Sequence, residues 1–279
     1  MTHFYNKQAD LVKGTIRDAL KMDLYPSVTT ILRCLNKPGI NDYIVQQAIM
    51  GALTMPRTGE ESDIQLMRRI IADGKQAAED AARVGTDFHA LINQYIMTGI
   101  VNIEMIDPQY LKCLEALYNF FMENKLVGQS EIQFANHRLG YGGCVDFAGI
   151  LNDELVVIDF KTQAVKKALK SGLPAFKTYP EHAYQLAAYR NALVEQCPEY
   201  EKAKCINIMI STNPEIPGIK VKTWPTRHAK NMNVYDAQKV FASALKIYRA
   251  QHHFPENQLS EVPTTVKLLI ESFEIPKAS

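Results

Sequence analysis

The sequence predicts a mixed α/β (α+β) fold, in which a central mixed β-sheet carries helices on its faces. Three observations indicate this class. Residues 1–126 follow mainly helical spacing, the alternation typical of strands begins near residue 131, and two later helical segments lie among the remaining strands. We expect a helical N-terminal part over 1–126, a sheet-containing core over 127–255 and a tail over 256–279, together forming one compact unit.

The N-terminal part divides into four helical segments. Ser27 is a candidate N-cap for a short first helix, which we expect to stop at Pro38-Gly39. Further helices are predicted over about 41–53, 61–98 and 107–125. We expect Gly85-Thr86 to interrupt the longest of them, with Thr86 capping its second half.

The remaining residues predict a sheet. Strands are expected over 131–134, 144–151, 154–162, 206–210 and 219–224, and helices over about 181–196 and 234–251. Between them, residues 163–180 form a long connection, rich in lysine, of the kind that supplies lids or binding loops. The last residues are expected to form a tail or a short helix.

Composition narrows the class of protein. The 279 residues are 47% hydrophobic, enough for a full core, and the net charge of +1 gives no overall basic field. Five cysteines without a C-x-x-C pair favour reduced thiols over disulfides or a zinc site. Because the N-terminus lacks a signal-peptide core and no stretch reaches the ~18 apolar residues of a membrane span, we expect a cytosolic protein without membrane contact.

Any contact with nucleic acid would depend on local basic patches, because the net charge is near zero. The candidates are Lys166, Lys167, Lys170 and Lys177, or Lys220, Lys222, Arg227 and Lys230.

Two acids are predicted to face each other across a hairpin. If the turn is Asn152-Asp153, counting back along both strands places Asp146 opposite Asp159. Opposed like charges repel, so a divalent cation between them is the expected occupant. Lys161 follows two residues after Asp159, and the alternation of a strand turns it to the same face. The apolar residues around them indicate a central strand, whose end would open into a cleft.

Five short motifs occur in a recognisable order. They are Pro26-Ser27-Val28-Thr29, Gly85-Thr86-x-x-His89, Gly143-x-x-Asp146, Ile158-Asp159-x-Lys161-Thr162 and Gln185-x-x-x-Tyr189. Together they resemble the PD-(D/E)XK nuclease superfamily, in particular its RecB-like exonuclease branch, and the first is similar to phage exonucleases related to the mitochondrial genome maintenance exonuclease. The resemblance implies a restriction-endonuclease-like core, with the helical N-terminal part arching over the active site.

The same resemblance implies a set of metal ligands. Asp146 and Asp159 would be ligands, with the backbone carbonyl of Phe160 as a third and His89 as an additional one. Carboxylates, waters and phosphate oxygens suit Mg²⁺, and an imidazole ligand shifts the preference toward Mn²⁺. The expected cofactor is therefore Mg²⁺ or Mn²⁺.

Four further side chains have implied roles. Lys161 would orient the attacking water and stabilise charge in the transition state. Gln185 would help to position the nucleophile or the lysine, and Tyr189 would lie near DNA, although this pair on one helix face could simply be exposed. Glu131 either assists a second metal or is a solvated strand residue.

The activity implied by the resemblance is that of a metal-dependent DNA exonuclease, which hydrolyses phosphodiester bonds from free ends and favours single-stranded DNA, in phage or bacterial replication, recombination or degradation. The alternatives are a structure-specific endonuclease of the same fold and a non-catalytic protein that binds DNA ends. An iron–sulfur cluster is not expected, because Cys197 and Cys205 have no further cysteine downstream. Helicase motifs are missing, so a helicase or single-strand-binding protein would have to act as a partner. The location would be the cytoplasm, and for a phage-encoded protein the cytoplasm of its bacterial host.

Overall fold

The computed structural model describes residues 2–35, 38–227, 232–255 and 262–267. Its strands are β1 (Thr2–Tyr5), β2 (Leu11–Gly14), β3 (Tyr25–Pro26), β4 (Leu126–Asn136), β5 (Tyr141–Leu151), β6 (Glu154–Gln163), β7 (Lys204–Ser211), β8 (Ile219–Trp224) and β9 (Thr265–Val266). Its α-helices are α1 (Ile16–Lys21), α2 (Val28–Ile31), α3 (Pro38–Thr54), α4 (Asp63–Thr98), α5 (Leu111–Glu123), α6 (Pro180–Gln196) and α7 (Val234–His252). Every helix among the described residues is too short or too polar to span a lipid bilayer.

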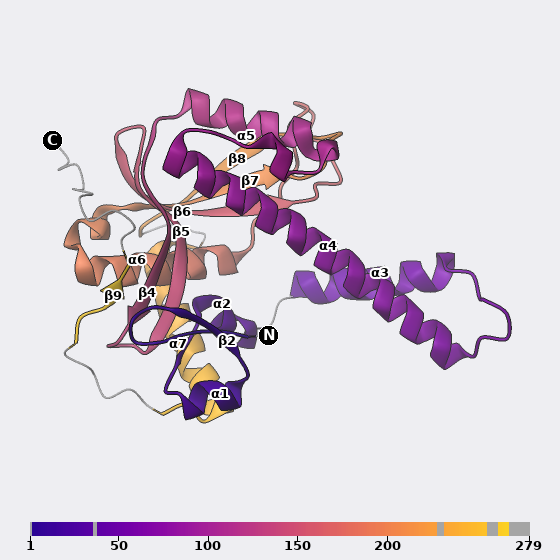
Figure 1. Cartoon of the computed structure of the whole chain (residues 1–279), viewed down its shortest axis with the longest axis horizontal. Coiled ribbons are helices and arrows are strands. Elements are labelled where there is room, and N and C mark those ends of the chain that lie inside the picture. The colour runs from indigo at the N-terminus through magenta and orange to yellow at the C-terminus, as the bar shows by residue number, and fades with distance from the viewer. Residues whose placement is uncertain (1, 36–37, 228–231, 256–261, 268–279) are drawn as a thin grey trace.

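The predicted mixed α/β class is confirmed. Six strands form one sheet in the order β8-β7-β6-β5-β4-β9, and a small second sheet has the order β2-β1-β3 (Figure 1). Strands β4, β5 and β6 form an antiparallel meander, whereas β6 and β7 run parallel. Parallel neighbours require a crossover connection, and α6 supplies it.

The hairpin between β5 and β6 has the predicted register. Leu151 pairs with Glu154, and the ladder continues to Phe147 and Ile158. Both turn residues, Asn152 and Asp153, have positive φ angles of 49° and 64°. A two-residue turn of this type matches the right-handed twist of the strands, and asparagine and aspartate tolerate the left-handed conformation it requires.

The sheet lies between two layers of helices. On one face, α2, α6 and α7 pack on side chains that include Val157. On the other face, α4 and α5 pack on Val156, Ile158 and Phe160. Adjacent residues of β6 therefore bury side chains on opposite faces, as predicted for a central strand.

The longest helix differs from expectation. α4 runs without a break from Asp63 to Thr98, so Gly85-Thr86 does not interrupt it. The Thr86 hydroxyl donates to the carbonyl of Ala82 one turn earlier and does not cap a new helix. A Cβ atom at Gly85 would lie 3.0 Å from the hydroxyl of Thr162 on β6. The glycine therefore allows close approach of helix and strand, which is a packing reason for a residue that weakens helices.

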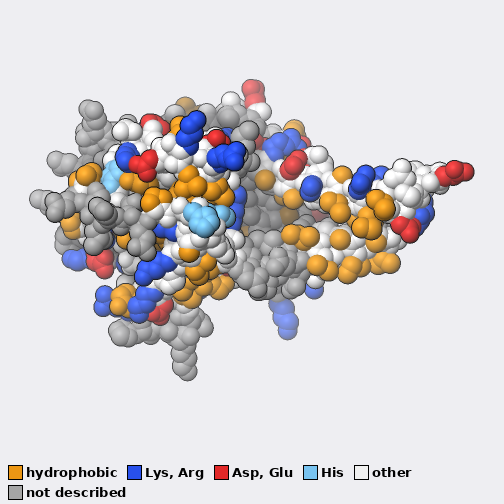
Figure 2. Space-filling view, turned by 90° about the horizontal axis from the view of Figure 1, so that it is seen from below, with side chains coloured by type: hydrophobic (Ala, Val, Ile, Leu, Met, Phe, Trp, Pro, Cys, Tyr) orange, Lys and Arg blue, Asp and Glu red, His pale blue; other side chains and the backbone are white. Residues whose placement is uncertain are grey.

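A helical arm projects from the core. The helical segment after Ser27 ends at Cys34, before Pro38-Gly39, and Pro38 itself begins α3, which agrees with the preference for proline in the first turn of a helix. α3 packs along the N-terminal half of α4, and together they extend away from the sheet (Figure 1). Figure 2 shows hydrophobic side chains along this arm, and the exposed ones include Ile49, Leu53 and Ile64.

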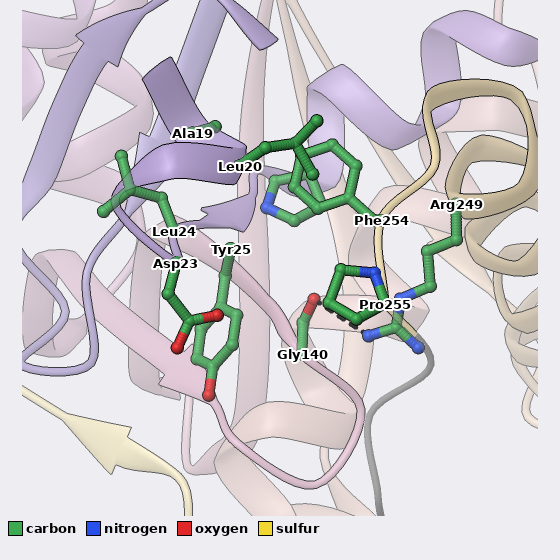
Figure 3. Close-up of a pocket in the computed structure, with 10 residues that line it drawn as sticks. Ala19, Leu20, Asp23, Leu24, Tyr25, Gly140, Arg249, Phe254 and Pro255 are labelled. Atoms are coloured by element: carbon green, nitrogen blue, oxygen red, sulfur yellow. Dashed lines mark hydrogen bonds between the residues drawn. The ribbon is translucent and has the colours of Figure 1, made fainter. Parts of the chain in front are cut away.

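The small sheet at the N-terminus is absent from the sequence-based prediction. Its strands have only two to four residues, too few for a clear alternation, and β3 pairs with β1 across a distance in the chain that no local pattern reveals. A guanidinium group anchors the neighbouring core, because Arg249 of α7 donates to the carbonyl oxygens of Leu139 and Gly140. Figure 3 shows this contact beside a cavity of about 40 Å³, which has room for water only.

The chain after residue 255 was expected to be a tail or a short helix. Of this segment the structure describes only 262–267, where β9 pairs with β4 and forms the edge of the sheet. Two residues give no periodicity, so the sequence carries no signal for this strand.

Candidate active site

A pocket of about 230 Å³ opens where β5 and β6 approach α4, α6 and the small sheet. It is lined by His3, Tyr5, Ser27, Val28, Thr29, His89, Gly143, Cys144, Asp146, Asp159, Lys161, Gln185 and Tyr189. The structure thus brings residues from all five motifs into one pocket. Six side chains to which a role was assigned line it directly, and Glu131 joins them through the acidic cluster described next.

Three acids lie side by side across the sheet. Counting along the ladders places Glu131 of β4 opposite Asp146 of β5, and Asp146 opposite Asp159 of β6. Regular strand pairing is interrupted at these positions. The β4–β5 ladder has no pair at Glu131, and the last pair of the β5–β6 ladder involves Phe147, next to Asp146. Glu131 also has a φ angle of 54°, which costs a residue with a side chain roughly 1–2 kcal/mol. Strain of this kind concentrates at functional sites.

One imidazole and two of the acids could hold a metal ion. Ligand atoms of His89, Glu131 and Asp146 all lie within 4.8 Å of one another. Ligands about 2.1 Å from an octahedral cation are about 3.0 or 4.2 Å apart, so the spacing fits a cation such as Mg²⁺ or Mn²⁺. His89 Nδ1 is 3.7 Å from Asp146 Oδ2, too far for a hydrogen bond but suitable for two ligands of one ion.

Local structure explains how each of these ligands is placed. Gly85 lets α4 approach β6, and His89 follows one turn later on that helix. Asp146 is fixed because its Oδ2 accepts a hydrogen bond of 2.8 Å from the backbone N–H of Phe160. Glu131 accepts a hydrogen bond of 3.2 Å from the thiol of Cys144. The role proposed for the Phe160 carbonyl stays a prediction.

Asp159 has different partners from the other acids. Its side chain is 1% exposed and accepts from Lys161 Nζ at 2.8 Å and from Asn207 Nδ2 at 2.6 Å. Asn207 in turn accepts from the indole N–H of Trp224 at 2.6 Å. Asp159 lies outside the cluster of His89, Glu131 and Asp146, so its role as a metal ligand stays a prediction.

Asn207 and Trp224 were not singled out from the sequence. A signal was present for the first, because Asn207 interrupts the apolar run between Cys205 and Ile210. A fully buried amide in a central strand needs hydrogen-bond partners, and here they are the acid on one neighbouring strand and the indole on the other.

A hydrogen-bonded chain leads from Asp159 to α6. Lys161 Nζ also donates to Gln185 Oε1 at 3.0 Å, and Gln185 Nε2 donates to the Tyr189 hydroxyl at 2.7 Å. Gln185 and Tyr189 therefore face the pocket together, and the alternative of an exposed pair is wrong. Gly143 makes room for the rings of Tyr189 and Phe134, because a Cβ there would lie 3.2 Å from the first and 2.7 Å from the second.

Burial and neighbouring charges together shift the pKa values of Asp146, Asp159 and Lys161. Burial raises the pKa of Asp146 and of Asp159 above the ordinary carboxyl range, although the charge of Lys161 opposes the rise at both. Burial alone would lower the pKa of Lys161, but Asp159 and Asp146 outweigh it, and the pKa of the lysine is raised. Lys161 therefore keeps its proton at neutral pH, and a cation would bind the acids in competition with protons.

The basic candidates separate into two groups. Lys166, Lys167 and Lys177 line a second, larger cavity of about 1000 Å³ between the connection 163–179 and helices α3 and α4. Lys170 is exposed and is not part of that lining.

The other basic group stays apart from both cavities. Lys222 lies over the Trp224 ring at 4.9 Å, and Arg227 lies over Tyr235 at the same distance. Lys220 is exposed on β8, and Lys230 falls outside the described residues.

Comparisons with known proteins give no family assignment: no protein-family model matches the chain, and no relative is found among curated proteins.

Replacing His89 with alanine should weaken Mn²⁺ binding about tenfold or more, because one of the three clustered ligands is lost. Titration of Mn²⁺ followed by thermal unfolding measures this effect without an activity assay. Any activity lost at low Mn²⁺ should be partly recovered at high Mn²⁺, since the two carboxylates remain. If the variant and the wild type bind Mn²⁺ with equal affinity, His89 is not a metal ligand and serves only in packing.

Proposed function

We propose that the chain is a metal-dependent DNA exonuclease of the PD-(D/E)XK superfamily, related to its RecB-like branch. The observation that carries the proposal is the position of Lys161, whose ammonium group is held between Asp159 and Gln185. It shares one pocket with His89 and Asp146, two members of the candidate metal cluster. A fixed cation beside a metal cluster suits phosphoryl transfer, because negative charge grows on the phosphate in the transition state.

The residues would divide the work in a definite way. A divalent cation held by His89, Glu131 and Asp146 would make a water more acidic and draw charge from the scissile phosphate. Lys161 would use its third N–H to orient the attacking water, and its positive charge would stabilise the charge that develops on the phosphate. Asp159 would keep the lysine charged and in place, and Gln185 would fix its direction.

The surroundings favour a single strand as substrate. The pocket volume of about 230 Å³ is below the roughly 300–1,000 Å³ of sites that take drug-sized ligands, so it would accept about one nucleotide at a time. Next to it lies the larger cavity with Lys166, Lys167 and Lys177, where phosphates could follow the lysines. Lys161 lines the pocket, and Gln163, two residues later on β6, lines the larger cavity. A single strand of DNA could therefore continue from the pocket into the cavity.

The decisive experiment compares linear with covalently closed circular single-stranded DNA of the same sequence, in Mg²⁺, Mn²⁺ or EDTA. We expect linear strands to be degraded from an end in either metal, circles to persist, and EDTA to stop the reaction. Comparable degradation of circles would favour the structure-specific endonuclease. Cleavage of neither substrate, together with tight binding, would favour the non-catalytic end-binding protein.

A further inference from the structure

The wall of the pocket opposite the metal cluster comes from the N-terminal sheet and α2. Tyr5 of β1 and the hydroxyl residues Ser27 and Thr29 line this wall. It is attached to the core at Gly142, because Ser27 forms a β-bridge to that residue. A Cβ at Gly142 would lie only 2.5 Å from Tyr5 Cβ, so the glycine makes room for the tyrosine.

The hydroxyl of Tyr5 is a donor without a partner in the described part of the chain, on a residue that lines the pocket. The residue is 4% exposed, and its hydroxyl makes no hydrogen bond to any residue in the described part of the chain. Burial, and then the nearby Cys144 and Glu131, raise its pKa above the usual tyrosine value. The ring begins over Gly142, and Gly142, Cys144 and Asp146 share one face of β5. The Tyr5 ring thus lies on the face of β5 that also carries Asp146 of the metal cluster.

Unpaired positive charge lies at the rim of the same wall. His3, which lines the pocket, is opposite Lys13 in the β1–β2 ladder. Burial lowers the pKa of His3, and the positive charges of Lys13 and Arg33 lower it further. Lys13 and Arg33 are exposed, and neither forms an ion pair with a residue that the structure describes.

We propose that this N-terminal wall binds a phosphate group of the DNA strand next to the scissile bond, with the Tyr5 hydroxyl donating to a phosphate oxygen and Lys13 and Arg33 supplying positive charge. The site rests on the proposed nuclease function, and it lies outside the three motifs that carry the metal and the lysine. An anion is the matching ligand, because the wall offers donors and cations but no acid of its own. The Tyr5 hydroxyl makes no hydrogen bond within the described chain, so it is available to donate to a phosphate oxygen. Tyr5 is here a positioning residue.

The charge of the wall is tested by DNA binding without cleavage. Fluorescence anisotropy of a labelled single-stranded oligonucleotide in EDTA should show about tenfold weaker binding for the double variant Lys13→Gln, Arg33→Gln at low salt. The slope of log K against log salt should fall by about 0.7, the value for one lost phosphate contact on a single strand. The matched control Arg17→Gln, Lys21→Gln also removes two positive charges, on α1, none of whose residues lines the pocket, and should bind like the wild type. Equal affinity of the double variant and the control would overturn the proposal.

The role of the hydroxyl is tested by Tyr5→Phe, which keeps the buried ring. We expect kcat/KM on linear single strands to fall about tenfold or more, as for the loss of a hydrogen bond to a charged group. Thermal stability should stay unchanged or rise, because the hydroxyl has no partner in the free protein. A structural hydroxyl would give the opposite pair of results, a lower melting temperature with unchanged kinetics.

Two controls separate this site from the proposed function. If the wild type fails to cleave any DNA, the nuclease proposal fails, whereas the anisotropy comparison in EDTA still decides whether the wall binds phosphate.

Oligonucleotides with a 5′-phosphate, a 3′-phosphate or hydroxyl ends then identify which phosphate of the DNA binds to the wall. An effect of the double variant that is equal for all three indicates a phosphate within the strand. An effect confined to one phosphorylated end indicates a terminal phosphate at the same site.

Discussion

Asp146→Asn should lower cleavage of linear DNA by about 10³-fold or more, while leaving the metal-free protein at least as stable as the wild type. The carboxylate belongs to the candidate metal cluster, and its hydrogen bond from the Phe160 N–H fixes its direction. Asparagine keeps the size and an acceptor oxygen, so the fold should survive. It removes the charge, which is the property that both the metal and the transition state require.

The stability predicted for Asp146→Asn follows from the direction in which the pKa of Asp146 is shifted. Burial raises the pKa of Asp146 in the native state above its unfolded value, so the native state binds more protons between the two values. The free energy of unfolding of the metal-free wild type should therefore decrease as pH rises from the ordinary carboxyl range through the raised native pKa. Asp146→Asn should flatten this decrease, and it also relieves Asp159 of a neighbouring negative charge.

Mn²⁺ should reverse the pH trend in the wild type only. A ligand at 100 times its dissociation constant adds about 2.7 kcal/mol of stability, and metal binding strengthens with pH as the acids lose their protons. Thermal unfolding at pH 6 and pH 8, in EDTA or Mn²⁺, measures both effects. Asp153→Asn in the turn of the same hairpin is the matched control, since asparagine also tolerates its positive φ. A strong Mn²⁺ shift in Asp146→Asn would contradict the ligand assignment.

Much of the core could be predicted because it depends on local rules. A two-residue turn with positive φ fixes the register of the hairpin, and the register fixes which residues of β6 face which helix layer. Asp146 and Lys161 could therefore be placed in one pocket from spacing alone. The same rule applied once more, from β4 to β5, places Glu131 opposite Asp146, but the exact turn between those strands was not evident in the sequence.

The parts that could not be predicted depend on contacts distant in sequence. Tyr5 reaches the pocket only because β1 pairs with β3 and rests on Gly142, and no periodicity in four residues indicates this. The glycine at position 85, which local spacing predicts to be a helix break, lies within α4 where the hydroxyl of Thr162 on β6 leaves little room for a side chain. The role of Asn207 depends on its hydrogen bonds with Asp159 and Trp224, which lie on the two neighbouring strands. Tertiary contacts override local propensity at each of these positions.

Lys161→Met should lower the single-turnover cleavage rate by about 10²- to 10³-fold while leaving the affinity for Mn²⁺ within a few fold of the wild type. The ligand atoms of His89, Glu131 and Asp146 are untouched, so only the stabilisation of developing charge is lost. The variant should also lose stability as pH rises, because Asp159 is 1% exposed and loses its cationic partner. Asn207 still donates to Asp159, which limits this loss.

Lys161→Arg should not restore the rate, and this outcome distinguishes geometry from charge. The ammonium group sits 2.8 Å from Asp159 and 3.0 Å from Gln185, and a longer planar guanidinium cannot occupy that position with the same donors. Lys177→Met is the matched control, since this residue lines the larger cavity and should weaken DNA binding without changing the rate at saturating DNA. If Lys161→Met instead cleaved at a normal rate but bound Mn²⁺ poorly, the lysine would serve the metal site, and its assigned role at the scissile phosphate would be wrong.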